Sequence, residues 1–143
     1  MTETLPETRS LIVERVMSHA PQKIWRALTQ APLLESWMMQ NDFEPVVGRP
    51  FNFRAPPMPN WNGVIDCKVL EVEPHTRLAY SWTPAGDTRG WVVTWTLTPA
   101  DGGTHVRMEQ SGFGPGDDAA FQGATFGWRR FVGALEDVLG KTD

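Results

Sequence analysis

The sequence predicts an α+β protein in which a curved antiparallel sheet encloses a long C-terminal helix. Two observations predict this arrangement: the order of the patterns along the chain, and the one-sided apolar alternation within the expected strands. The order is a first strand, a pair of short helices, a run of strands and a final helix. The chain has 143 residues, which is about the length of one domain. We therefore expect a single domain over residues 1–143.

The N-terminal part predicts a strand followed by two short helices. Apolar residues from Leu11 to Met17 indicate a strand over Arg9–Met17. Pro21 and Pro32 each stand where a first helical residue is expected, because the fixed φ of proline suits that position and its missing N–H is not needed there. The apolar residues that follow at helical spacing are Ile24, Trp25 and Leu28, and then Leu33, Leu34 and Trp37.

The centre of the chain predicts strands joined by turns. Residues 55–60 contain three prolines, which remove the donors of a sheet ladder, so this stretch is expected to be a loop. Asp101-Gly102-Gly103 is a strong hairpin signal. The expected strands are Phe51 to Phe53, Gly63 to Val72, Leu78 to Trp82, Trp91 to Thr98 and Thr104 to Gln110, with a turn at Pro74-His75.

Alternation along the strands predicts which side chains point inward. Apolar residues recur at every second position, so one face of the sheet should be apolar and the other wet. The inward set on the last two strands is Trp91, Val93, Trp95, Leu97, Val106, Met108 and Gln110. His105, Arg107 and Glu109 fall on the outer face, where we expect a solvated charge cluster.

The C-terminal segment predicts a helix over Asp118 to Leu139. Apolar residues recur there at steps of three and four, and Asp117 and Asp118 suit the positive end of a helix. Glycines 123, 127 and 133 lie inside it, and each costs about 1 kcal/mol relative to alanine. They indicate either close packing or room beside the helix, and we expect close packing.

Charge and hydropathy exclude several classes of partner. The net charge is −4, and Arg129-Arg130 is the only adjacent basic pair, so binding to a nucleic-acid backbone is not expected. No apolar run approaches the ~20 residues of a membrane-spanning helix. The first ten residues are polar and do not resemble a signal peptide, so we expect a cytoplasmic protein.

Neither a metal nor a cofactor is expected. The single cysteine, Cys67, permits no internal disulfide and is interpreted as a small buried apolar side chain. The histidines show no ligand spacing; they are His19, His75 and His105. We assign no catalytic residue.

Residues spread over nearly the whole chain carry a family resemblance. They are Arg15, Ala20-Pro21, Trp25, Leu28-Thr29 and Trp37 near the start; Gly63-Val64, Val72-Glu73-Pro74 and Arg77 to Trp82 in the centre; and Gly103-Thr104, Val106, Met108, Gly127-Trp128, Phe131 and Leu135 toward the end. In this order they resemble the helix-grip fold of the START-like (SRPBCC) superfamily. Within it, they resemble the family named after the activator of the heat-shock-protein-90 ATPase. The resemblance implies a cavity between sheet and helix, on a scaffold shared by lipid carriers, cyclases and binding proteins.

The sequence departs from the family pattern in two places. Gly48 is followed by Arg49-Pro50-Phe51 rather than by a second glycine, and this proline is expected to blunt a sheet edge. The eukaryotic activators carry a further N-terminal domain, which we do not expect in this protein. We therefore expect the resemblance to indicate a fold and a cavity rather than a chaperone partner.

The candidate ligand-binding residues are aromatic, with a few methionines and polar groups. The inward-facing set is Phe53, Tyr80, Trp82, Trp95, Met108, Gln110 and Trp128. Trp37, Met38 and Met39 end the second short helix, where the resemblance implies a cavity entrance, and Trp61 lies beside Met58 on a neighbouring loop as a candidate lid. The alternative is that all these residues only fill a core.

Three functional hypotheses follow from this pattern. We favour a protein that binds a small apolar molecule, aromatic or lipid-like, in the cavity. The alternative is an enzyme of the cyclase or dehydratase kind, in which Tyr80 and Gln110 orient a carbonyl group. A co-chaperone-like protein binder ranks third, and nothing in the sequence supports a protein partner.

Overall fold

The computed structural model describes residues 8–59, 61–84 and 90–142, and it has the predicted architecture. Along the chain the elements are β1 (Arg9–Met17), α1 (Pro21–Thr29), α2 (Ala31–Trp37), β2 (Gln40–Asn41), β3 (Pro50–Arg54), β4 (Val64–Glu73), β5 (Arg77–Pro84), β6 (Trp91–Ala100), β7 (Gly103–Phe113) and α3 (Asp118–Gly140). Every strand expected from the sequence is present. The short β2 was not expected, because two residues are too few to show an alternation.

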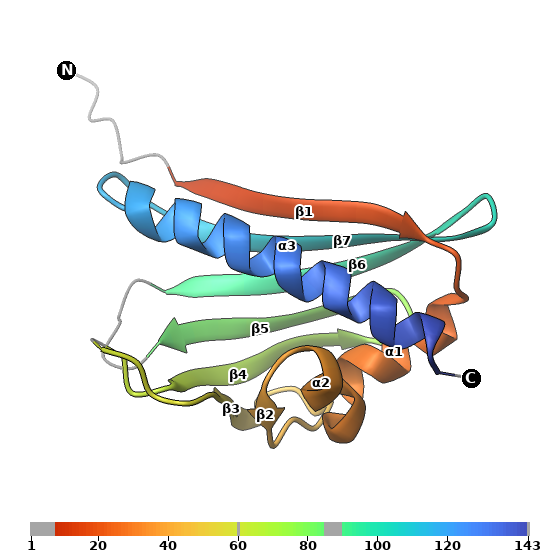
Figure 1. Cartoon of the computed structure of the whole chain (residues 1–143), viewed down its shortest axis with the longest axis horizontal. Helices are drawn as coiled ribbons and strands as arrows, with labels where there is room; N and C mark the ends of the chain where they lie inside the picture. The colour runs from red at the N-terminus through yellow and green to blue at the C-terminus, as the bar shows by residue number, and fades with distance from the viewer. Residues whose placement is uncertain (1–7, 60, 85–89, 143) are drawn as a thin grey trace.

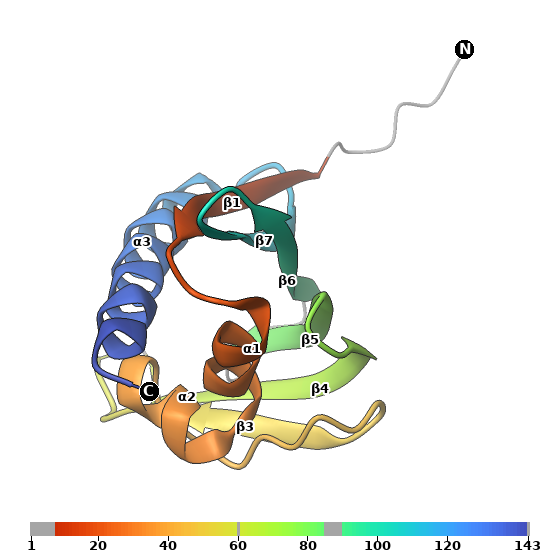
Figure 2. The same cartoon turned by 90° about the vertical axis from the view of Figure 1, so that its right-hand side faces the viewer.

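The strands of the described residues form one seven-stranded antiparallel sheet in the order β1-β7-β6-β5-β4-β3-β2. Figure 1 shows α3 lying obliquely across the sheet, from the β1 side toward α1. Seen from the end, the sheet curls from β1 to β3, with α3 along its open side and α1 and α2 at one end (Figure 2). This is the helix-grip arrangement that the resemblance implied.

The outer face of the sheet carries the expected charge cluster. Glu14 of β1 pairs in register with Arg107 of β7, and its carboxylate lies 3.5 Å from His105 and 3.7 Å from Arg107. Arg107 also donates to Glu109 at 3.0 Å. These side chains are partly exposed, so the prediction of a solvated charge cluster on the outer face is confirmed.

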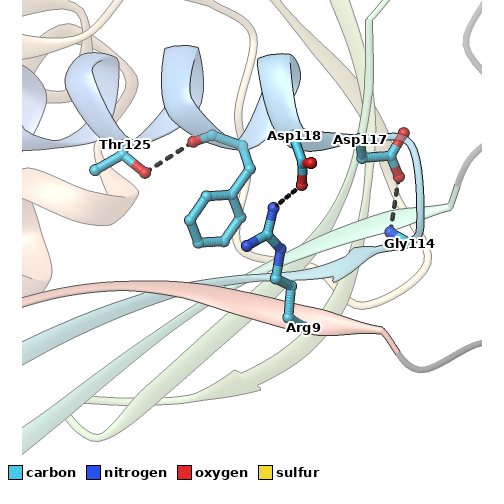
Figure 3. Close-up of polar contacts among 6 residues, drawn as sticks. Arg9, Gly114, Asp117, Asp118 and Thr125 are labelled. Atoms are coloured by element: carbon cyan, nitrogen blue, oxygen red, sulfur yellow. Dashed lines mark hydrogen bonds and ion pairs between the residues drawn. The ribbon is translucent and has the colours of Figure 1, made fainter.

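The first turn of α3 is fixed to the sheet by polar contacts (Figure 3). Arg9 of β1 forms an ion pair with Asp118, and its guanidinium lies 4.0 Å from the centre of the Phe121 ring. The carboxylate of Asp117 accepts a hydrogen bond of 2.7 Å from the backbone nitrogen of Gly114. The N-terminal strand and the turn before α3 thereby set where the helix begins.

The glycines of α3 lie beside open space. A Cβ added at Gly123, Gly127 or Gly133 would have no atom of another part of the protein within 4 Å. The expectation of close packing was therefore wrong, and the alternative of room beside the helix is the correct one.

The core is a continuous cluster of aromatic rings between sheet and helix. Phe53, Tyr80, Trp95 and Met108 are all at most 1% exposed. The indole Nε1 of Trp95 donates to the Tyr80 hydroxyl at 3.0 Å. Burial raises the pKa of Tyr80 well above its usual value, and the hydrogen bond from Trp95 offsets only part of this. The phenol therefore stays neutral in the folded protein.

Trp128 should contribute strongly to stability. It is 3% exposed and lies 5.1 Å from Trp82 and 5.9 Å from Trp95, measured between ring centres. Trp128→Ala should lower the free energy of unfolding by about 3–5 kcal/mol, measured by chemical denaturation. Phe126 on the same helix is 68% exposed, and Phe126→Ala should cost under about 0.5 kcal/mol. A loss below about 1 kcal/mol for Trp128→Ala would show that this ring is not part of the core.

Tyr80 is the only tyrosine of the chain, so its ionisation can be followed by the absorbance of tyrosinate. In the unfolded chain the phenol loses its proton near pH 10, whereas the folded pKa lies higher, so stability falls as the pH rises above about 10. We expect tyrosinate absorbance to appear only together with the loss of circular-dichroism signal. Ionisation with a midpoint near pH 10 in a still-folded protein would contradict this.

Candidate ligand-binding site

A groove of about 760 Å³ opens between the end of α2, the loop before β4, and the middle of α3. This volume lies within the range of small-molecule sites, roughly 300–1,000 Å³. Its lining is mainly apolar: Trp37, Met38, Met39, Ala55, Pro56, Met58, Trp61, Ile65, Trp82, Gly127, Phe131 and Ala134. The remaining lining residues are polar and exposed; they are Glu35, Ser36 and Arg130. A second hollow of about 540 Å³ continues the groove toward Arg54, and the two share Glu35, Met38, Met39, Ala55 and Pro56.

Backbone hydrogen bonds join the described residues of the loop at the mouth of the groove. Met58 and Trp61 exchange two backbone hydrogen bonds of 2.9 Å, and the Ala55 nitrogen donates to the Gly63 carbonyl at 2.8 Å. Gly63 has a φ of +86°, and a Cβ there would lie 2.1 Å from the Ala55 oxygen, so only glycine fits. Trp61 is half-buried, and its Nε1 donates to the Val64 carbonyl at 3.3 Å. The loop therefore holds an indole against the groove.

A smaller chamber of about 160 Å³ lies beside the groove, between α3 and the strands β5 to β7. It is lined by Trp82, Trp91, Gln110, Ala120, Ala124, Gly127, Trp128 and Phe131. Trp82, Gly127 and Phe131 line both hollows, so the groove and the chamber adjoin at these residues. The side-chain oxygen of Gln110 accepts a hydrogen bond of 2.7 Å from the Trp128 indole, which links β7 to α3.

The sequence-predicted residues divide into two groups. Those that the structure brings to the groove or the chamber are Trp37, Met39, Trp61, Trp82, Gln110 and Trp128. Phe53, Tyr80, Trp95 and Met108 lie instead in the packed core beneath, and they line none of the hollows described above. A ligand could touch these four side chains only if the core opened.

Sequence reasoning missed part of the lining on α3. Gly127, Arg130, Phe131 and Ala134 follow one another at steps of three, one and three residues, which is one side of a helix. Glu35 and Ile65 were also missed. The stripe on α3 was detectable from this spacing, but its apolar members were interpreted as core contacts.

The described residues offer no grouping of three or more His, Cys, Asp or Glu side chains that could hold a metal ion. Cys67 is buried as predicted, and burial raises the pKa of its thiol, with Asp66 and Asp42 adding to the effect. A neutral thiol in such surroundings is a poor nucleophile.

No helix in the described residues is both long enough and apolar enough to cross a bilayer.

Comparison with known proteins places the chain in a family. The model of the family "Activator of Hsp90 ATPase homolog 1-like protein" matches residues 18–140. Protein MLL2253 from Mesorhizobium loti, known from a crystal structure, shares 50% sequence identity with this chain. The match covers 94% of this chain and 99% of that protein, and the two structures superpose with a TM-score of 0.86.

Two further solved structures share the fold at lower identity. DynU16, described as a putative protein in the dynemicin biosynthetic locus, is 24% identical over 92% of this chain and 47% of its own, with a TM-score of 0.80. The Aha1 dimer from Colwellia psychrerythraea is 24% identical over 92% of this chain and 96% of its own, with a TM-score of 0.77. A search of curated proteins gives no match. With a family match over 18–140, the chain belongs to the Activator of Hsp90 ATPase homolog 1-like protein family.

Proposed function

We propose that this protein binds a small apolar molecule, aromatic or lipid-like, in the groove between α2, α3 and the loop before β4. The observation that carries the proposal is the apolar lining of a hollow of about 760 Å³. Apolar surface left in water costs about 25 cal/mol per Å² relative to burying it. A bound apolar molecule would cover this surface, and the tied loop around Trp61 keeps the surface in place.

The charged groups of the groove support an apolar ligand with its polar part at the mouth. Glu35 and Arg130 are the ionisable residues of the lining, and both are exposed to water. A ligand that reaches past them meets Trp37, Trp82 and Phe131. An aromatic ring can pack against these rings edge to face or offset, which favours an aromatic ligand.

The position of Tyr80 favours binding over catalysis. In the enzyme hypothesis, Tyr80 and Gln110 would orient a carbonyl group, but Tyr80 lies in the core and lines neither the groove nor the chamber. Gln110 lines the chamber, and an amide neither gives up nor takes a proton near neutral pH. No observation among the described residues favours the co-chaperone-like alternative.

The proposal is tested with N-phenyl-1-naphthylamine, a neutral probe whose fluorescence rises in apolar surroundings. Trp61→Ala should weaken binding about tenfold, because the indole covers a ligand from the loop side. The same change should alter the free energy of unfolding by less than about 1 kcal/mol, because Trp61 is only half-buried. Both quantities are measured on the same protein preparations.

Phe126→Ala is the matched control for Trp61→Ala. Phe126 is a large exposed aromatic residue on α3 that does not line the groove, so its removal should leave probe binding unchanged. If neither this probe nor a panel of hydrophobic molecules binds or raises the melting temperature, the protein is not the binding module proposed here. If a bound molecule is chemically altered, the enzyme alternative replaces it.

A further inference from the structure

Gln110 is a buried amide whose orientation is fixed by its partner. The residue is 1% exposed, and its Oε1 lies 2.7 Å from the Nε1 of Trp128. An indole N–H can only donate, so the amide must present its oxygen to Trp128 and its NH₂ group away from it. The chemistry of the pair therefore settles which end of the amide is the donor.

The NH₂ group of Gln110 has no acceptor among the described residues. The bond from Trp128 is the one hydrogen bond that this side chain makes there, and it uses the oxygen. The NH₂ group is not one of the fully buried side-chain atoms that lack a partner among the described residues, so it keeps contact with the chamber, where water or a ligand can accept its hydrogen bond. Gln110 also lines the chamber, which contains no other described polar side chain except the indoles.

The chamber is a hollow open to the surface with room for one aromatic ring, and it adjoins the groove beside Gly127. Its volume is about 160 Å³, close to that of an engineered apolar cavity that takes up benzene, about 150 Å³. Gly127 lines both hollows, and a Cβ there would meet no atom of another part of the protein within 4 Å. The missing side chain leaves the two hollows adjoining at this point of α3.

We propose that the chamber is a specificity subsite for an aromatic molecule bearing a carbonyl oxygen, which accepts a hydrogen bond from the NH₂ group of Gln110. The remainder of the molecule lies in the groove, so this inference rests on the proposed binding function. Trp82 and Phe131 flank the ligand where the two hollows adjoin. Trp128 acts as a positioning residue, because it binds the amide oxygen and so leaves the NH₂ group for a ligand in the chamber.

Two probes of matched shape test the inference. 2-Acetylnaphthalene carries a ketone oxygen, and 2-isopropenylnaphthalene has a CH₂ group in its place. In the unaltered protein the ketone should bind roughly three- to tenfold more tightly, the range that one net hydrogen bond supplies. In Gln110→Met the ratio of the two dissociation constants should fall to about one. The ratio is taken within one variant, so a general loss of stability affects both probes alike.

A second pair of variants tests the passage without touching Gln110. Gly127→Val fills the junction of groove and chamber, and it should remove the preference for the ketone and weaken both probes. Gly123→Val is the matched control, because this glycine also lies in α3 beside open space but lines neither hollow. It should leave both dissociation constants within about twofold of the unaltered protein. These two variants test whether the chamber supplies the preference for the ketone, even if Gln110→Met does not fold.

The outcomes separate this inference from the proposed function. Equal affinity for the two probes in the unaltered protein would overturn the carbonyl subsite and leave the binding function standing. The subsite is also overturned if the ketone preference survives in both Gln110→Met and Gly127→Val. If neither naphthalene nor N-phenyl-1-naphthylamine binds, the subsite and the binding function fail together.

Discussion

The structure depends on the burial of large indole rings, two of which donate their N–H groups to an acceptor on a neighbouring element. An unsatisfied buried donor costs about 1–3 kcal/mol, so these hydrogen bonds restrict how helix and sheet can meet. The indole of Trp128 on α3 reaches Gln110 of β7, and that of Trp95 on β6 reaches Tyr80 of β5. The first bond fixes the middle of α3 against the sheet. The second fixes two neighbouring strands within the core.

The same rings border the open hollows beside α3. The rings of Trp128 on α3 and Trp82 on β5 pack against each other and so join the helix to the sheet. Gly127, the residue before Trp128, has no side chain to occupy the adjoining space. The groove and the chamber both open to the surface and adjoin at this glycine, and we interpret them as room for a ligand.

Much of the fold was predictable from the sequence because it follows from short-range patterns. Proline at the start of α1 and α2, alternation in β6 and β7, and apolar spacing in α3 each gave the correct element. The family resemblance then supplied the way these elements pack. Residues of β2 carry no such pattern, since two residues cannot show a period.

The candidate site was predictable only in part, because alternation separates inside from outside but not core from cavity. Tyr80 and Trp82 share one face of β5, yet Tyr80 is packed in the core and Trp82 lines the groove. The three glycines of α3 look alike in the sequence, and only Gly127 borders both hollows. Such distinctions depend on how sheet and helix curve together, which no local pattern encodes.

The most direct test of the binding site is a heteronuclear NMR titration of the indole N–H signals of the seven tryptophans with N-phenyl-1-naphthylamine. Single Trp→Phe variants assign the signals. The account predicts that the signals of Trp61 and Trp82, which line the groove, shift as the probe is added. Those of Trp25 and Trp95, which do not line it, should stay in place. Equal shifts at all four tryptophans, or shifts confined to Trp25 and Trp95, would contradict a binding site in this groove.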